Sequence, residues 1–93
     1  AERALSLQPT AAHIIGTLGW VAHKAGQNDR ALQHLRDARL RSPDSAQTRY
    51  YLGATLAAMG RSGEARIELD AAVKSGRAFA GRKDAEALLA SLK

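Results

Sequence analysis

Apolar side chains recur along this chain at intervals of three and four residues, which places them on one face of an α-helix. The pattern predicts the end of a helix over residues 1–8, then further helices over residues 11–25, 29–41, 45–59, 63–75 and 82–92. Alternating β-branched runs and Asn-Gly or Asp-Gly turns, which would indicate strands and hairpins, are missing. The sequence therefore predicts an all-α fold.

Each of the last five helices has an expected buried face. In the first, it consists of Ile14, Leu18, Val21, Ala22 and Ala25. In the next three, it consists of Ala31, Leu32, Leu35 and Ala38, then Leu52, Thr55, Leu56 and Met59, then Ala65, Leu69, Ala72 and Val73. The last helix has Ala85, Leu88, Leu89 and Leu92 on one side and polar residues on the other, as expected of a helix that covers the end of a stack.

Prolines, glycines and capping residues predict where the helices begin and end. Pro9 and Pro43 are expected to stop the helices before them, and Gly26 and Gly60 to end the following ones. The predicted N-caps are Thr10, Asn28, Asp44 (in a capping box with Gln47) and Ser62.

The same residue types recur 34 positions apart. The recurring pairs are Pro9 and Pro43, Leu18 and Leu52, Gly19 and Gly53, Gly26 and Gly60, Ala31 and Ala65, Leu35 and Leu69, and Ala38 and Ala72. A period of this length is typical of stacked helix-turn-helix units. Such stacks present extended surfaces that mostly bind other proteins.

The composition narrows the possible functions. A length of 93 residues allows one domain, and the absence of cysteine excludes disulfides and thiolate metal sites. No apolar run reaches the roughly 18 residues of a membrane-spanning helix, and no signal peptide is visible. The net charge of +5 is spread along the chain rather than gathered in one tract, so a nucleic acid partner is not expected.

The repeated positions match the motif W-x2-L-G-x2-Y, A-x3-F, A and P of the tetratricopeptide repeat. The first unit supplies Ile15-x2-Leu18-Gly19-x2-Ala22, Ala31-x3-Leu35, Ala38 and Pro43. The second supplies Arg49-x2-Leu52-Gly53-x2-Leu56, Ala65-x3-Leu69 and Ala72. Arg49 stands where tryptophan is common, and Arg77 where the second proline is expected. The chain therefore resembles the tetratricopeptide repeat family.

This resemblance implies a right-handed stack of antiparallel helix pairs, a solenoid fragment with a C-terminal capping helix. Its parts would be the tail of a preceding unit, two full units and the cap, over residues 1–9, 10–43, 44–77 and 78–93. The structural repeat positions would be Leu18, Gly19, Ala31, Ala38, Pro43, Leu52, Gly53, Ala65 and Ala72. Gly19 and Gly53 would let the paired helices approach closely.

A narrower likeness concerns three phrases of the chain. They are Leu18-Gly19-Trp20, Arg49-Tyr50-Tyr51-Leu52-Gly53 and Glu86-Ala87-Leu88-Leu89-Ala90-Ser91-Leu92. These phrases are similar to the C-terminal end of bacterial repeat lipoproteins linked to exopolysaccharide export and exosortase-type sorting. The compartment stays open between the cytoplasm and the bacterial cell envelope.

In this family the first helix of each unit lines a concave groove, which implies a set of partner-binding residues. They are His13, Trp20, His23, Lys24, Gln47, Tyr50 and Tyr51. Trp20 either lines the groove or packs between helices. Tyr50 and Tyr51 diverge by about 100° around the helix, so only one can face the groove squarely. The clamp with which some members hold a peptide carboxylate is missing, because Gly16, Trp20, Gln47 and Tyr51 occupy its positions.

The function predicted first is a non-catalytic interaction module that binds a peptide or partner helix in its groove. The alternatives are a self-associating scaffold and a binder of anionic polymers through Arg36, Arg39, Arg41 and Arg49. Those arginines would otherwise be surface charges balanced by Asp37 and Asp44.

No catalytic phrase and no cofactor motif is present. A metal site is not expected either, since no two of His13, His23 and His34 have the spacing of a metal-binding pair.

Overall fold

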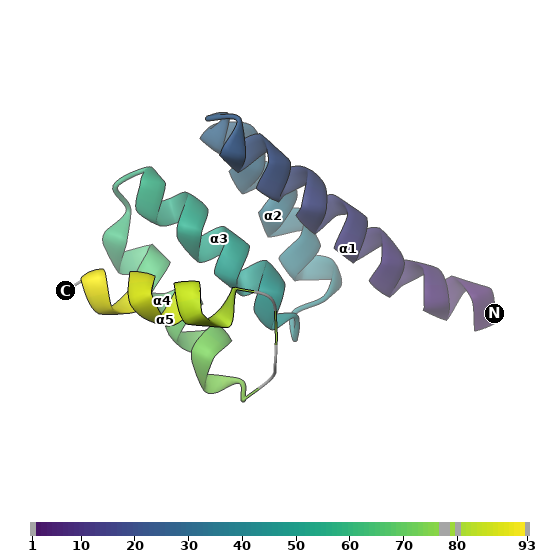
Figure 1. Cartoon of the computed structure of the whole chain (residues 1–93). Coiled ribbons are helices and arrows are strands. Elements are labelled where there is room, and N and C mark those ends of the chain that lie inside the picture. The colour runs from purple at the N-terminus through teal and green to yellow at the C-terminus, as the bar shows by residue number, and fades with distance from the viewer. Residues whose placement is uncertain (1, 77–78, 80, 93) are drawn as a thin grey trace.

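The computed structural model describes the backbone of residues 2–76, 79 and 81–92, and the side chains from residue 11 onward within these ranges. This part of the chain folds into five α-helices and contains no strand. The helices are α1 (Glu2–Lys24), α2 (Asn28–Arg41), α3 (Ala46–Ala58), α4 (Ser62–Lys74) and α5 (Arg82–Ser91) (Figure 1). The predicted all-α class is confirmed. Apart from the start of α1, the predicted helix ends lie within one residue of the observed ones.

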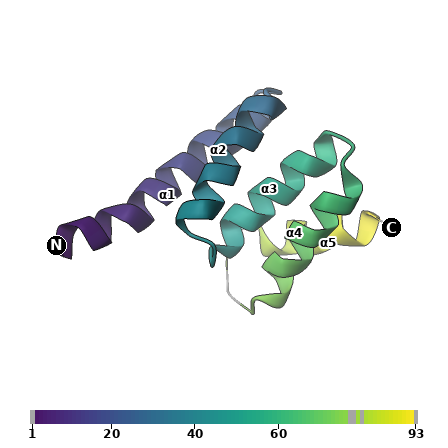
Figure 2. The same cartoon turned by 180° about the vertical axis from the view of Figure 1, so that it is seen from behind.

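The helices pack as consecutive antiparallel pairs. α1 packs mainly on α2 and α3 mainly on α4, while α2 joins the two pairs through its contact with α3 (Figures 1 and 2). α5 packs on α4 and also contacts α3. Since α1 touches α3 and α3 touches α5, these three helices follow one another along one side of the stack, and the capping position predicted for the last helix is confirmed.

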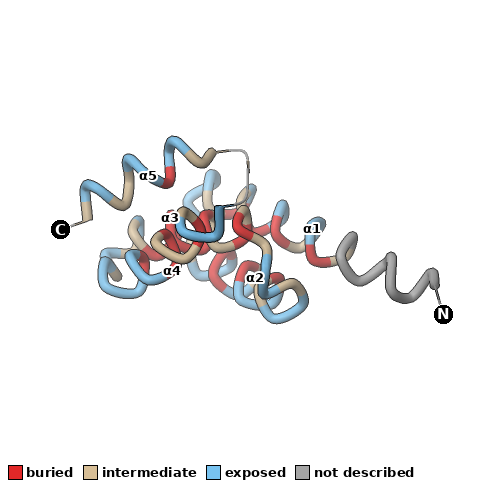
Figure 3. Tube along the Cα trace, turned by 90° about the horizontal axis from the view of Figure 1, so that it is seen from below, coloured by how far each residue is buried: buried red, intermediate tan, exposed pale blue. Residues whose placement is uncertain are grey.

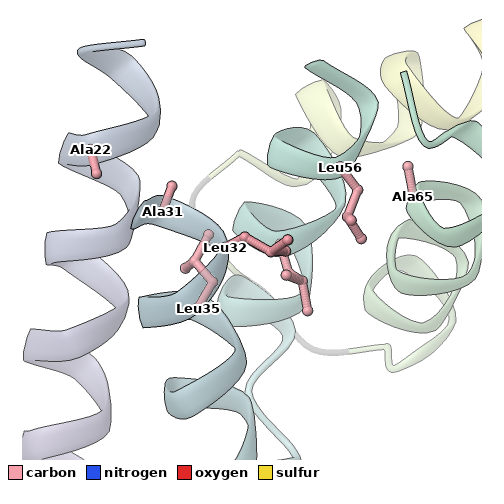
Figure 4. Close-up of a cluster of buried hydrophobic side chains, with 7 residues drawn as sticks. Ala22, Ala31, Leu32, Leu35, Leu56 and Ala65 are labelled. Carbon is pink, nitrogen blue, oxygen red and sulfur yellow. The ribbon is translucent and has the colours of Figure 1, made fainter. Parts of the chain in front are cut away.

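The buried apolar residues are alanines, leucines and Tyr50. The buried positions lie where the helices face one another (Figure 3). Figure 4 shows one cluster, in which Leu32 and Leu35 of α2 lie between Ala22 of α1 and Leu56 of α3. The buried positions predicted for α2, α3 and α4 are confirmed, with Met59 and Val73 only partly buried. The largest side chains with almost no exposure are Leu35, Leu52, Leu69 and Thr55.

Two glycines bring the paired helices close together. A Cβ atom added to Gly19 would lie 2.7 Å from Leu35 Cγ, and one added to Gly53 would lie 2.6 Å from Leu69 Cγ. The same hypothetical atom at Gly53 would lie 3.3 Å from the carbonyl oxygen of Ala65. The close approach predicted for both repeat units is therefore confirmed.

The helix break predicted at Pro9 is wrong. α1 runs without interruption from Glu2 to Lys24, so Thr10 lies inside a helix and caps nothing (Figure 1). A proline inside a helix removes one hydrogen bond and costs about 3 kcal/mol, which favours a break at that point but does not impose one. The repeat boundary placed between residues 9 and 10 stays a prediction, because no turn marks it.

The buried face predicted for α1 is also largely wrong. Ala22 is buried, but Ala25 is exposed and Ile14, Leu18 and Val21 are 53%, 51% and 59% exposed. From residue 11 onward, the residues that α1 buries are instead Ala12, Gly16, Gly19 and Ala22. The helices approach so closely that only small residues fit between them, so the larger apolar side chains lie on the neighbouring face.

The other three predicted N-caps are also wrong. Asn28 begins α2, and its Oδ1 lies 3.0 Å from His23 Nδ1 instead of capping the helix. At α3 the N-cap is Ser45, whose hydroxyl accepts a hydrogen bond from Thr48 N, so there is no capping box between Asp44 and Gln47.

At α4, Ser62 is the first helical residue and the N-cap position belongs to Arg61, which makes no side-chain cap. At both α2 and α4, the N-cap is the turn residue directly before the helix, and its side chain makes no capping hydrogen bond. Gly26 and Gly60, each with a positive φ, directly precede these cap positions; each ends the preceding helix and fixes where the next one begins.

A buried carboxylate joins the two repeat units. Glu68 of α4 is 7% exposed, and its two oxygens lie 2.5 Å from Arg39 Nη1 of α2 and 3.2 Å from Arg49 Nη1 of α3. Both arginines remain about one third exposed, so their charges keep part of their hydration. The cluster therefore links three helices through one fully paired acid.

We expect Glu68→Gln to lower the free energy of unfolding by about 1–2 kcal/mol, because the amide leaves two arginines without their buried partner. Glu64→Gln is the matched control, since its carboxylate is half exposed and pairs with Arg61 and Arg36. The control should lose no more than about 0.5 kcal/mol. Urea unfolding at pH 7, followed by circular dichroism, measures both, and equal losses would contradict a joining role for Glu68.

Candidate functional site

A stacked pair of aromatic rings lies where α1 meets α3. The ring centroids of Trp20 and Tyr51 are 4.3 Å apart and their planes differ by 14°. Each residue is half-buried, so part of each side chain contacts the core and part remains open to solvent. Rigid aromatic side chains in this state offer a large contact area at a low cost in conformational entropy.

Two basic side chains from the next turn of α1 surround Trp20. The His23 ring is stacked 5.0 Å from the Trp20 ring, and Lys24 Nζ lies 5.0 Å from the Trp20 centroid. This distance is within the range of a cation–π interaction. The ammonium group therefore lies beside the aromatic pair and gives this part of the surface a positive charge.

The two adjacent tyrosines have different environments. Tyr50 is buried, and its ring lies 6.0 Å from the Phe79 ring and directly over Gly81, where an added Cβ would come within 2.7 Å of Tyr50 Cε2. Tyr50 thus packs against the segment that leads into α5. Burial raises the pKa of Tyr50, and the nearby negative charge of Asp84 raises it further, so the phenol stays protonated at neutral pH.

A small cavity lies beside Tyr51, between the middle of α1 and the start of α3. It has a volume of about 70 Å³. Its lining residues are Ala12, His13, Gly16, Ser42, Ser45, Gln47, Thr48 and Tyr51. Gln47 donates a hydrogen bond to the Tyr51 hydroxyl. Because a water molecule occupies roughly 30 Å³, the cavity can take a methyl-sized side chain but no cofactor.

The predicted partner-binding residues therefore gather around the junction of α1 and α3. Trp20, His23, Lys24 and Tyr51 form one group, which we call the aromatic face. His13 and Gln47 line the adjacent cavity, while Tyr50 lies beneath and contacts both Trp20 and Tyr51.

Sequence reasoning missed Phe79, Ser42 and Ser45 at this site. Phe79 lies in the segment between α4 and α5, where no helical spacing indicates a direction. The two serines belong to the turn around Pro43, where Asp44 was the predicted N-cap.

The four arginines proposed as an anionic-polymer surface are all paired. Arg36 contacts Glu64, Arg39 and Arg49 contact Glu68, and Arg41 contacts Asp37. The predicted balance by Asp37 is confirmed, but Asp44 forms no ion pair within the described ranges. Three carboxylates therefore balance most, but not all, of the charge of these four arginines.

The described residues form neither a metal-binding cluster nor a membrane-spanning helix. No group of three or more His, Asp or Glu side chains there is arranged to hold a metal ion. No helix in that part of the chain combines the length and the apolar character needed to cross a bilayer.

Comparison with known protein families assigns the chain. A family model described as tetratricopeptide repeat matches residues 22–92, which is more than half of the sequence. No curated protein matches. Together with the stacked helix pairs, the match shows that this chain belongs to the tetratricopeptide repeat family. Repeats of this family generally mediate protein–protein interactions and are generally non-catalytic.

Proposed function

We propose that the chain binds an extended or helical segment of a partner protein across the aromatic face. The observation that carries this proposal is the stack of two partly exposed rings, Trp20 and Tyr51, from two successive helices of the same side. Tryptophan and tyrosine are enriched among the residues that dominate interface energies. A partner side chain that packs against this pair would contact both repeat units at once.

The charges around the aromatic face indicate the chemistry of the partner. Lys24 and His23 adjoin Trp20, and His13 lines the neighbouring cavity. The face has no acidic member, and the whole chain carries a net charge of +5. We therefore expect a segment with an aromatic or aliphatic anchor next to an acidic residue, which would be attracted at low salt.

Selection of peptides from a random 12-residue phage library against residues 1–93 tests the proposal. We expect the selected peptides to share one apolar anchor flanked by Asp or Glu. Trp20→Ala should weaken their binding by about tenfold or more, as expected for a central aromatic contact. Lys24→Glu should weaken the binding of acidic peptides. Its side chain is exposed, so the lost contact with Trp20 and the reversed charge in the last turn of α1 should cost no more than about 1–2 kcal/mol of stability. Fluorescence anisotropy measures the affinities.

Leu40→Ala is the control, because Leu40 is an exposed apolar residue of α2 and not part of the aromatic face. Its affinity for the selected peptides should equal that of the unmodified chain. Circular dichroism must show that Trp20→Ala remains folded. If the peptides bind Trp20→Ala and Lys24→Glu as tightly as the unmodified chain, the aromatic face is not the binding site.

A further inference from the structure

The small cavity beside Tyr51 contains a hydroxyl group that has no partner among the described residues. Thr48 of α3 is only 5% exposed, and the structure shows no hydrogen bond from its Oγ1 to any described residue. In the described part of the chain, no fully enclosed side-chain oxygen or nitrogen lacks a partner, so this hydroxyl opens onto the cavity that Thr48 lines. A Cβ atom added to Gly16 of α1 would lie 3.7 Å from Thr48 Oγ1, so the oxygen is directed across the cavity toward α1.

Other hydroxyl groups line the same cavity. Ser45 Oγ accepts a hydrogen bond from Thr48 N, which leaves the hydroxyl proton of Ser45 for another acceptor. The Tyr51 hydroxyl accepts a hydrogen bond from Gln47 Nε2 and keeps its proton in the same way. Ser42 supplies a further hydroxyl. The cavity therefore presents neutral groups that can both donate and accept hydrogen bonds.

Size and charge limit what the cavity can bind. Its volume of about 70 Å³ is that of about two water molecules, so a hydroxymethyl group, with its two non-hydrogen atoms, fits into it. No Lys, Arg, Asp or Glu side chain lines it. Asp44 directly precedes Ser45 and forms no ion pair within the described ranges, so its negative charge offsets the positive end of the α3 dipole. A neutral hydroxyl is therefore favoured over a carboxylate.

We propose that the cavity binds the hydroxyl side chain of a serine or threonine in the partner segment, while the apolar anchor of that segment lies on the aromatic face. This inference rests on the proposed function, because Tyr51 belongs to both sites. Inside the cavity, the partner's hydroxyl would donate one hydrogen bond and accept another, and Thr48 would gain the hydrogen bond that it lacks.

The direction of α1 sets the spacing of the two partner residues. Gly16 lines the cavity and Trp20 forms the stack, and the four residues between these positions correspond to about 6 Å along the helix. In an extended segment, alternate residues point to the same face at intervals of about 6.6 Å. We therefore expect serine or threonine two residues from the anchor. Lys24 follows Trp20 by one further turn, so the acidic residue of the partner would lie on the other side of the anchor.

Parallel selections on two chains test the proposal. The 12-residue phage library is selected against the unmodified chain and against Thr48→Val, which keeps the shape of the side chain but removes its hydroxyl. With the unmodified chain, the peptides should carry Ser or Thr two residues from the anchor, on the side away from Asp or Glu. With Thr48→Val this enrichment should disappear, while the apolar anchor remains.

Synthetic peptides measure what the hydroxyl contributes. A selected peptide is compared with one that has alanine in place of its serine and with one that has phosphoserine there. Fluorescence anisotropy should show that alanine weakens binding to the unmodified chain by about fivefold, the loss expected for one neutral hydrogen bond. Phosphoserine should weaken it by about tenfold or more, because the phosphate exceeds the cavity and meets the charge of Asp44. For Thr48→Val, the serine and alanine peptides should bind equally.

Two further substitutions separate the cavity from its surroundings. Gly16→Ala puts a methyl group into the cavity at ordinary contact distances, so the chain should fold and lose its preference for serine over alanine. Thr55→Val is the matched control, since Thr55 is a fully buried threonine of α3 whose hydroxyl bonds to the Tyr51 carbonyl oxygen and which does not line the cavity. Its preference for serine should be unchanged. Circular dichroism checks that each variant is folded.

The outcomes distinguish this inference from the proposed function. If the peptides depend on Trp20 but keep their preference in Thr48→Val and Gly16→Ala, the cavity is not a binding site and the aromatic face stands. Peptides that need Thr48 but not Trp20 would support the cavity and contradict the aromatic face. Peptides that depend on neither residue would overturn both. Enrichment of Asp or Glu in place of Ser or Thr would show that the cavity binds a carboxylate, which would overturn the inference.

Discussion

Replacement of Gly53 by valine is expected to destabilise the chain by about 3 kcal/mol. The Cβ of any side chain here falls 2.6 Å from Leu69 Cγ and 3.3 Å from the Ala65 carbonyl oxygen. Leu69 is fully buried, so it cannot rotate away, and the backbone of α4 can give way only if the pair separates. Since valine adds two further methyl groups, α3 and α4 would have to move apart along their whole contact.

Gly53→Val also has a conformational effect, which stabilises the helix and so opposes the steric one. Removing a glycine from a helix interior gains up to about 1 kcal/mol, with less for a β-branched residue. Gly63→Val isolates this gain, because an added Cβ at Gly63 of α4 meets no atom within 4 Å. We expect the control to be neutral or slightly stabilising. Urea unfolding of both variants, with Gly53→Ala as an intermediate step, measures the difference, and equal stabilities would contradict the close approach.

The buried face of α1 was harder to predict from the sequence than the buried faces of α2, α3 and α4. In α2, α3 and α4, spacing alone identified the core, because each of these helices is contacted on both sides by neighbours in the chain. In α1, the same reasoning selected Ile14, Leu18 and Val21, which are exposed. These residues are more hydrophobic than Gly16 and Gly19, but α1 and α2 lie so close together that only small residues fit between them. The spacing of apolar residues predicts which face of a helix is apolar, but it does not predict which neighbouring helix covers that face.

The polar ends of the helices were the least predictable part of the fold. Asn28, Asp44 and Ser62 are of residue types that favour the N-cap position, yet none of them occupies it. The choice between adjacent candidates depends on the φ and ψ angles of the turn, which the preceding glycine or proline sets. The ion pairs of Glu68 with Arg39 and Arg49 could not be predicted either, since the three residues come from three helices.

The residues of the candidate site were predicted as a set, but their individual environments were not. The family resemblance placed Trp20, His23 and Lys24 on the groove side of the first helix, and the stack of Trp20 on Tyr51 follows from the way α1 meets α3. Which of the two adjacent tyrosines is buried depended on the path of the chain after α4. Phe79 and Gly81 lie in that segment, and they enclose Tyr50 rather than Tyr51.

Tyr50 helps to hold α5 on the rest of the stack. We expect Tyr50→Ala to destabilise the chain by about 3–4 kcal/mol. Its ring contacts Trp20, Tyr51 and Phe79, so its loss leaves a cavity between α3 and the segment before α5. α5 buries only one residue fully, Ala85, while Leu88 and Leu89 are partly buried against the same core cluster. Hydrogen exchange should show that amides of α5 lose protection before those of α2.

The matched variant Tyr50→Phe separates the ring from its hydroxyl group. No buried side-chain oxygen or nitrogen in the described part of the chain lacks a partner, and the structure shows no hydrogen bond from the Tyr50 hydroxyl to a described residue. We therefore expect Tyr50→Phe to stay within about 1 kcal/mol of the unmodified chain. If Tyr50→Ala instead weakened α1 and α2 as much as α5, Tyr50 would support the whole stack. If Tyr50→Phe cost as much as Tyr50→Ala, the hydroxyl would matter more than the ring. Since α5 packs on α4 as α3 packs on α2, a chain with α5 released should also expose a new apolar surface and begin to associate, which light scattering would detect.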